Sequence, residues 1–307
     1  CWPPRPPAAP VRERALARMR PDQAEGLRRL LDRSGLRVVS ISAGAGGSGK
    51  TGAIVNLAGA LAELGSDVLI LDESPAAHGV TAALGLKARF DLEDVIRRER
   101  DLDEVIVRGP AGILILPLAR GARSLAQLPA PEQQRLVERC GRLGFPVDTL
   151  LVDAAPGSAS ALVWPGAAAQ EVIVLAGGSA AAITAAYALI KRLSNEFARR
   201  EFHVLICNVA SESEARTIFA NMARVARRYL QVSLDLMGHV PPDDKLQHAA
   251  RLRLPVVAAF PGAAAAGSFR RLAQAIAGWP RPEEDGCGFD DFMRRLIHSN
   301  RPRAAAA

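Results

Sequence analysis

The sequence predicts a doubly wound α/β domain built on a mostly parallel β-sheet. Short apolar, β-branched runs recur along the chain, and each is apolar throughout rather than alternating, at 36–42, 68–72, 113–117, 149–153, 172–175, 204–208 and 234–240. Runs of this kind indicate strands that are covered on both faces. Helical stretches lie between most of them, notably at 52–64, 180–200, 213–229 and 244–252. This alternation predicts parallel strands joined by crossover helices in one domain.

The segments on either side of this pattern differ in composition. Residues 1–18 are rich in Pro and Arg and predict a flexible arm. Residues 19–34 contain a short amphipathic helix at 22–32, and the α/β pattern occupies 35–278. A Pro/Gly/acid linker at 279–288 leads into a last segment, 289–307, which predicts an amphipathic helix and a tail. Its apolar residues recur at i, i+3, i+4, i+7 and i+8, the spacing of one helical face: Phe289, Phe292, Met293, Leu296 and Ile297.

Composition limits the classes of function. The 307 residues are 49% hydrophobic, which suits a chain with a sizeable core, yet no apolar run approaches the ~20 residues that span a bilayer. The net charge of +7 comes from dispersed, mostly Arg side chains, which give only faint support for a nucleic-acid partner. The four cysteines show no metal or redox spacing, and the first 20 residues lack a hydrophobic stretch. We therefore expect a cytoplasmic protein.

A glycine-rich loop follows the first strand and precedes an apolar helix. It has the G-x-x-x-x-G-K-[ST] pattern, and we expect it to bind nucleotide through Gly44, Gly46, Gly47, Ser48, Gly49, Lys50, Thr51 and Gly52. Glycines allow the backbone to wrap phosphates with its N–H groups pointing inward, and the helix N-terminus adds a positive dipole end. Lys50 would reach the β- and γ-phosphates, and the Thr51 hydroxyl can ligate Mg²⁺. The pattern predicts ATP or ADP with Mg²⁺ as cofactors.

Two carboxylates end neighbouring apolar runs. Asp153 ends TLLVD and is followed by a small, flexible loop, which suits a residue that holds the Mg²⁺ shell through water. Asp72 ends VLILD and is a second candidate, with a catalytic role as one interpretation. For both residues, the alternative is an Asp that caps the next helix.

Several stretches carry a resemblance to a known family. Residues 45–51 resemble the deviant Walker A loop of MinD/ParA ATPases, K-G-G-x-G-K-[ST]. The chain is more specifically similar to the FlhG/FleN family, the MinD-like regulators of flagellar number and placement. Residues 22–28, DQAEGLR, resemble that family's N-terminal activator helix. Further resemblance lies at 72–86, 186–191 and 236–243, so that most of 20–280 is covered.

The resemblance implies further residues and partners. Asn208 matches the residue that reads the adenine edge, and the turn with Pro241 and Asp243 would flank the base. In the family, ATP drives a face-to-face homodimer, and a C-terminal amphipathic helix, here 289–297, then binds the inner membrane. The N-terminal helix, here 22–32, stimulates FlhF, a GTPase that resembles those of the signal-recognition particle. For 289–297 the alternative is a terminal helix that closes the core, and for 22–32 it is an ordinary helix packed on the sheet.

Three departures from the family pattern fall on hydrolysis or dimer-coupling positions. The lysine that reaches across the dimer is Ala45 here, the second Asp of the family's D-x-D is Ser74, and the Thr after the Asp of the metal site is Ala154. Glu73 is adjacent to Ser74, but alternation at a strand end should point it to the opposite face. An Arg or Lys acting on the transferring phosphoryl group is worth ~10³–10⁵ in rate. The sequence therefore predicts nucleotide binding with weak or absent hydrolysis.

Two alternatives to a flagellar regulator stay open at this point. One is an active MinD/ParA-type ATPase whose missing groups come from Glu73 or from a partner's arginine. The other is a different MinD-like module, acting in DNA partitioning, cell division or cellulose synthesis, against which the DQAEGLR helix argues.

Overall fold

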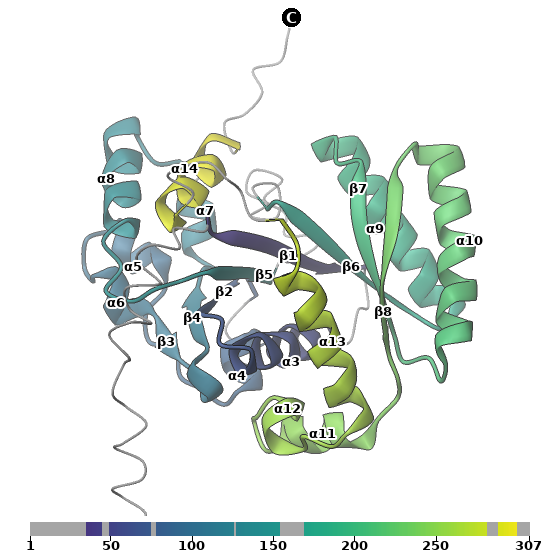
Figure 1. Ribbon diagram of the computed structural model, residues 1–307. Coiled ribbons are helices and arrows are strands. Elements are labelled where there is room, and N and C mark those ends of the chain that lie inside the picture. The colour runs from purple at the N-terminus through teal and green to yellow at the C-terminus, as the bar shows by residue number, and fades with distance from the viewer. Residues whose placement is uncertain are drawn as a thin grey trace, which may run out of the picture. The chain divides into compact units, whose positions relative to one another are not determined.

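An eight-stranded sheet forms the centre of the domain in the computed structural model, with the strand order β3-β4-β2-β5-β1-β6-β7-β8 (Figure 1). The structure describes residues 35–44, 49–74, 78–125, 127–153, 169–280 and 288–299. The strands are β1 (Arg37–Ala43), β2 (Val68–Asp72), β3 (Val107–Arg108), β4 (Leu114–Pro117), β5 (Thr149–Asp153), β6 (Glu171–Gly177), β7 (Glu201–Cys207) and β8 (Ser233–Val240). All neighbouring pairs are parallel except β3 with β4.

This sheet confirms the predicted doubly wound, mostly parallel α/β class. Each of the seven predicted strands is present, with ends that differ by up to three residues. The two-residue strand β3 was not predicted, because a segment that short carries no periodicity to detect. Every residue of β1, β2 and β5 is buried, which explains why these central strands are mostly apolar.

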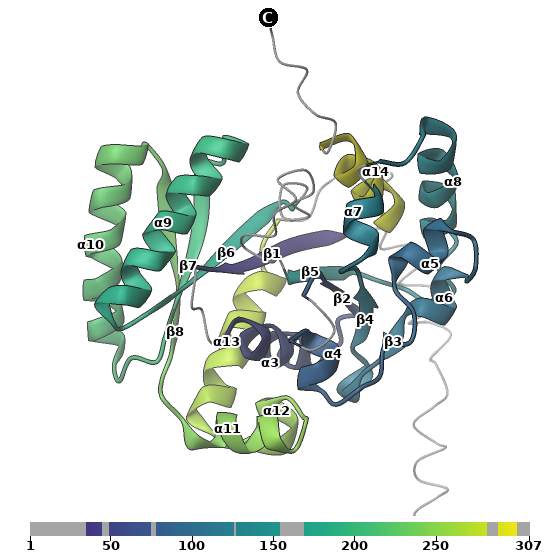
Figure 2. The same ribbon diagram turned by 180° about the vertical axis from the view of Figure 1, so that it is seen from behind.

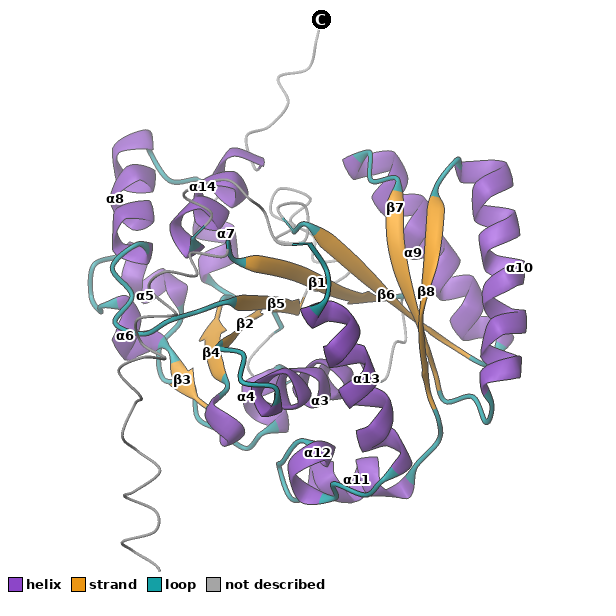
Figure 3. Cartoon of the chain, viewed as in Figure 1, coloured by secondary structure: helices purple, strands orange, loops and turns teal. Residues whose placement is uncertain are grey.

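Helices cover both faces of the sheet (Figures 2 and 3). They are α3 (Lys50–Glu63), α4 (Val80–Ala83), α5 (Leu92–Ile96), α6 (Leu102–Val105), η2 (Pro110–Gly112), α7 (Gly121–Leu125), α8 (Ala130–Cys140), α9 (Ala180–Phe197), α10 (Glu212–Leu230), α11 (Asp244–Arg251), α12 (Val256–Ala259), α13 (Ala264–Ala277) and α14 (Phe289–Ser299). The four helical stretches that the sequence singled out correspond to α3, α9, α10 and α11.

Alternate residues of each strand divide the core between the two faces. On one face, Val39 and Ile41 of β1 pack with α3, α12 and α13. On the other face, Val38 belongs to a cluster with α5, α8 and α14, while the strands β6, β7 and β8 meet α9 and α10. The helix α3, which follows the glycine-rich loop, is therefore held between the sheet and the C-terminal helices.

The two longest described helices, α9 and α10, each begin at a serine cap. The Ser179 hydroxyl accepts a hydrogen bond from the Ala182 N–H at 3.2 Å at the start of α9. Ser211 does the same for α10, accepting from the Glu214 N–H at 3.2 Å. These side chains satisfy N–H groups that have no partner within the helix, which fixes where each helix begins.

The C-terminal helix α14 packs into the domain core. Its apolar face is buried, with Phe292, Met293 and Leu296 at 0% exposure, and it lies against α8. The face predicted at 289–297 is therefore real, and in this structure it closes the core. That is the alternative to a membrane-binding surface that the sequence left open.

The chain divides into two units, Cys1–Ser34 and Gly35–Ala307. The predicted arm at 1–18 and the predicted activator helix at 22–32 belong to the first unit and lie outside the described residues. Within the described part of the chain, no helix combines the length and the apolar character needed to cross a bilayer.

Candidate functional site

The glycine-rich loop connects β1 to α3 at the carboxyl edge of the sheet. Ala45, Gly46, Gly47 and Ser48 lie outside the described residues, whereas Gly44 and Gly49 are described on either side of them. Gly49 has φ 117°, in the left-handed region that favours glycine. A Cβ on Gly44 would lie 2.4 Å from the backbone of Ala185 in α9, so this glycine also permits a close helix approach.

The first turn of α3 has no capping side chain among the residues that the structure describes, and it contains no acidic residue. Lys50, Thr51 and Gly52 form that turn. Unsatisfied N–H groups and the positive end of the helix dipole together favour an anion such as phosphate at this position.

Lys50, the first residue of α3, and Asp153, the last residue of β5, form an ion pair. The Lys50 side chain is 11% exposed and that of Asp153 is 0% exposed. Burial raises the pKa of Asp153, and the Lys50 ammonium works against that rise. Each of these buried charges needs a partner because a lone buried charge is costly. The pair therefore holds both groups of the predicted phosphate and metal site in place.

Asp72 lies beside Asp153 in the sheet, since these two residues are register partners at the ends of β2 and β5. Its Oδ1 accepts from the Ser74 N–H at 3.1 Å, and its Oδ2 accepts from the Val80 N–H at 2.7 Å, at the start of α4. A Cβ on Gly79 would lie 2.3 Å from Oδ2, which requires glycine there. Asp72 thus makes the helix-capping contact that the sequence left as the alternative to catalysis.

Burial also makes Asp72 electrostatically unusual. Burial, with a smaller contribution from the nearby Asp153, raises the pKa of the Asp72 carboxyl to about 6, although the Ser74, Val80 and Thr81 N–H groups oppose the rise. Ser74 links the two carboxylates, because its hydroxyl donates to Asp153 Oδ2 at 3.4 Å. Glu73, which follows Asp72, is 8% exposed. Two carboxylates and one hydroxyl therefore meet at this sheet edge.

The predicted base-binding residues lie at the ends of β7 and β8, on the same edge of the sheet. Asn208 is exposed, has φ 59°, and its N–H donates to the Val240 carbonyl at 2.8 Å. Pro241 is the first residue after β8. Asp243 is occupied by backbone: its Oδ1 accepts from the Lys245 N–H at 2.8 Å and its Oδ2 from the Ala265 N–H at 3.0 Å. Asp243 therefore caps α11 and ties it to α13, a role the sequence did not indicate.

The residues present fit Mg²⁺ held mainly by a nucleotide. No group of three or more His, Cys, Asp or Glu side chains that could bind a metal occurs among the described residues. Thr51 and Asp153 supply a hydroxyl and a carboxylate, the hard oxygen donors that Mg²⁺ prefers. Mg²⁺ is commonly held by one or two such groups together with substrate phosphates and water rather than by a protein cage.

This fold and this loop define a P-loop nucleotide-binding domain of the MinD type. The sequence model of the CobQ/CobB/MinD/ParA nucleotide binding domain matches residues 39–256. The antiactivator FleN of Pseudomonas aeruginosa is 35% identical over 262 residues, which cover 85% of this chain and 94% of that protein. The chain belongs to the FlhG/FleN family of MinD/ParA-type proteins, as its loop and the DQAEGLR segment predict.

More distant relatives agree on the fold. The flagellum site-determining protein YlxH of Helicobacter pylori is 25% identical over 219 residues, covering 71% of this chain and 74% of that protein. Among solved structures, the MinD cell division protein of Aquifex aeolicus superposes with a TM-score of 0.60 at 21% identity, covering 81% of this chain and all of that one. MinD from Pyrococcus horikoshii complexed with Mg-ADP gives a TM-score of 0.55 at 19% identity, covering 79% and 96%.

Proposed function

We propose that this protein is an ATP-binding regulator of flagellar number and placement with weak or absent hydrolysis. The observation that carries the proposal is the buried Lys50–Asp153 pair at the start of α3, next to an Asp72 that caps α4. Lys50, Thr51 and Asp153 suit phosphate and Mg²⁺, whereas Ser74 occupies the position at which the family resemblance implies a water-orienting carboxylate. The similarity to FleN and YlxH supports the flagellar role.

On nucleotide binding, the contact between Lys50 and Asp153 would be replaced by contacts of each side chain with the ligand. Lys50 would turn to the β- and γ-phosphates, and Asp153 would face the hydrated metal beside Thr51. Mg²⁺ would supply charge neutralisation at the phosphates. The N–H groups of the first turn of α3 would hold the phosphates, while Asn208 and the 241–243 turn would contact the base. None of these steps requires a general base, which suits a switch that responds to nucleotide occupancy.

The partners follow from the family. The segment 22–32 would stimulate an FlhF-like GTPase, and ATP would promote a homodimer. Contact with inner-membrane lipid through 289–297 would require α14 to leave the core. Exposing its five apolar side chains, each worth ~1.5–3 kcal/mol when buried, would cost about 7–15 kcal/mol before any compensation. The ATP dimer and the lipid together would have to offset that cost, so we propose a cytoplasmic protein that is only conditionally peripheral on the membrane.

Nucleotide binding and phosphate release, measured side by side with Mg²⁺ present, test the central proposal. We expect the wild type to bind a fluorescent ATP analogue and to release phosphate near background. Lys50→Ala should abolish binding, and Lys191→Ala, which removes an exposed lysine of α9, should not. Steady ATP turnover that depends on Lys50 would contradict the proposal of weak hydrolysis and would favour an active MinD/ParA-type ATPase.

GTP hydrolysis by the FlhF-like GTPase of the same organism tests the partner. We expect the wild-type chain to stimulate this hydrolysis and the double variant Gln23→Ala/Arg28→Ala to lose the stimulation while still binding nucleotide. Equal stimulation by the variant would remove the 22–32 segment from the proposal.

A further inference from the structure

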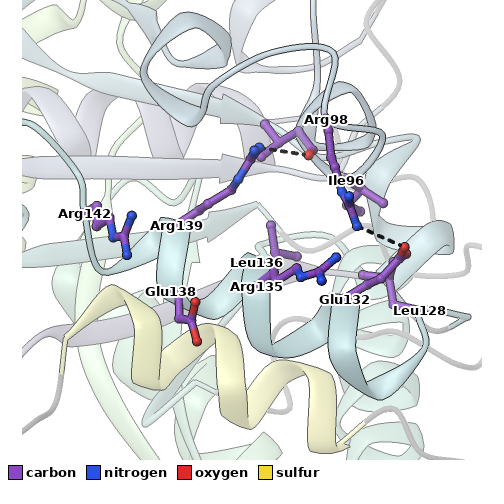
Figure 4. A pocket seen from close by; sticks show the side chains of 10 residues that line it. Ile96, Arg98, Leu128, Glu132, Arg135, Leu136, Glu138, Arg139 and Arg142 are labelled. Carbon is purple, nitrogen blue, oxygen red and sulfur yellow. Dashed lines mark hydrogen bonds and ion pairs between the residues drawn. The ribbon is translucent and has the colours of Figure 1, made fainter.

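A pocket of about 300 Å³ lies between α5 and α8, away from the glycine-rich loop (Figure 4). Part of its lining is apolar, from Val95, Ile96, Leu128 and Leu136. The rest is charged and dominated by four arginines: Arg98, Arg135, Arg139 and Arg142. Figure 4 shows these arginines around the pocket, whereas Glu138 points away from them. The pocket therefore combines a basic rim with an apolar floor.

Two of these arginines hold the walls together. Arg98 follows α5 and pairs with Glu132 of α8 at 3.4 Å. In the opposite direction, Arg139 of α8 donates to the Val95 carbonyl of α5 at 3.5 Å and lies 4.0 Å from Asp101. Both contacts join the two helices, so the pocket exists before any ligand arrives.

The other two arginines are available for a ligand. Arg135 and Arg142 are exposed, and neither guanidinium group has an ion-pair or hydrogen-bond partner within the part of the chain that the structure describes. Arg135, Arg139 and Arg142 follow at i, i+4 and i+7, on one side of α8 and the turn after it. At 1.5 Å per residue this row is about 10 Å long. The positive charges are therefore spread along a line and do not converge on a single anion.

We propose that this pocket binds an acidic segment of a partner protein. Carboxylates spaced along the segment would pair with Arg135 and Arg142, and one apolar side chain would enter between Val95 and Leu136. Guanidinium groups suit carboxylates because they form paired hydrogen bonds. A linear row of charges matches a peptide better than it matches one phosphate.

Neighbouring carboxylates argue against a flat anionic partner. Asp101, Asp103 and Glu104 of the α6 segment are exposed, and Asp101 lies 4.0 Å from Arg139. A membrane surface or a nucleic-acid backbone would bring phosphates against these side chains, and like charges in contact are unfavourable. A narrow peptide that pairs with Arg135 and Arg142, at the two ends of the arginine row, has to pass only Asp101 beside Arg139.

Fluorescence anisotropy on the full chain tests the proposal. The probe is a fluorescein-labelled peptide of four Glu-Glu-Leu repeats, with Gln-Gln-Leu and Glu-Glu-Ser repeats as controls for charge and for the apolar side chain. The test variant is Arg135→Glu/Arg142→Glu. The matched control is Arg227→Glu/Arg251→Glu, which reverses two exposed arginines on α10 and α11, well away from α8 (Figure 1).

We expect the wild type and the matched control to bind the Glu-Glu-Leu peptide alike, and the pocket variant to bind it at least tenfold more weakly. Both control peptides should bind more weakly than the probe. If both variants lose affinity for the Glu-Glu-Leu peptide equally, the attraction is non-specific and the proposal is wrong. The proposal is also wrong if the wild type does not bind this peptide. Loss of phosphatidylglycerol vesicle binding in the pocket variant, with peptide binding unchanged, would assign the site to lipid instead. Unchanged urea unfolding of both variants shows that the fold is intact.

Discussion

Replacing Asp72 with Asn should change how the stability of the protein depends on pH. In the folded protein the Asp72 carboxyl has its pKa raised from 3.8 to about 6, first by burial and then by Asp153. In the unfolded chain it titrates at the ordinary value. Because the folded pKa is the higher one, the folded state binds more protons between these values, and stability falls as the pH rises.

The magnitude follows from the two pKa values. The stability that Asp72 contributes is fully present below its unfolded pKa of 3.8 and is lost as the pH rises through about 6. Well above that pH the ionised form costs about 3 kcal/mol. Between about pH 5 and about pH 8, this one group should lower the free energy of unfolding by on the order of 1 kcal/mol. Asp153, whose pKa is also raised, acts in the same direction.

Urea unfolding of wild type and Asp72→Asn at these two pH values measures the effect. An Asn has one oxygen where Asp72 uses two, so the variant should lose either the Ser74 or the Val80 contact and be destabilised at about pH 5. It should nevertheless lose less stability than the wild type on going to about pH 8. Asp235→Asn, at an exposed position on β8, controls for the loss of one carboxylate. Equal pH dependence in wild type and Asp72→Asn would refute the reasoning.

Three further outcomes are expected. Ser74→Asp should raise phosphate release above that of the wild type, while Ser74→Ala should not. If Ser74→Asp binds ATP but releases phosphate no faster, the missing water-orienting carboxylate does not belong at position 74. Phe292→Ala should lower the free energy of unfolding by about 3–5 kcal/mol, since its side chain is fully buried in α14. A loss below ~1 kcal/mol, like that expected for the exposed Arg295→Ala, would mean that α14 is not docked. Asn56→Ala should cost about 1–3 kcal/mol in urea unfolding, because it leaves the Val256 N–H, now bonded to Asn56 at 2.6 Å, without its acceptor.

The central part of the fold was predictable because burial on both faces leaves a clear mark on composition. The runs that correspond to β1, β2 and β5 are mostly apolar, and Asp153 marks the end of β5, where that strand reaches the site. The helices α8 and α13 were not singled out. The first is short and mostly polar, and the second contains Gly267 and small residues that weaken its pattern.

Roles that depend on contacts across the fold were not predictable. Composition cannot decide whether a carboxylate after an apolar run faces a ligand or a helix start, and Asp72 and Asp243 both accept backbone N–H groups of helices. Periodicity likewise identified the apolar face of α14 without its partner, because a core and a membrane select the same side chains. The same limit applies to the pocket between α5 and α8, whose arginines come from segments 37 residues apart, Arg98 and Arg135.

The hydrogen bond between Asn56 and Val256 spans 200 residues of sequence. The helix α3 leaves the ribosome early, but the surface that covers it comes from α12 and α13, which are made about 200 residues later. At about 5–20 residues per second, that delay is about 10–40 s. During synthesis, the start of α3 is therefore present long before its supporting helices. A nascent chain arrested before Val256 should present apolar residues of α3 to chaperones, and nucleotide should be held firmly only after α12 and α13 have been translated.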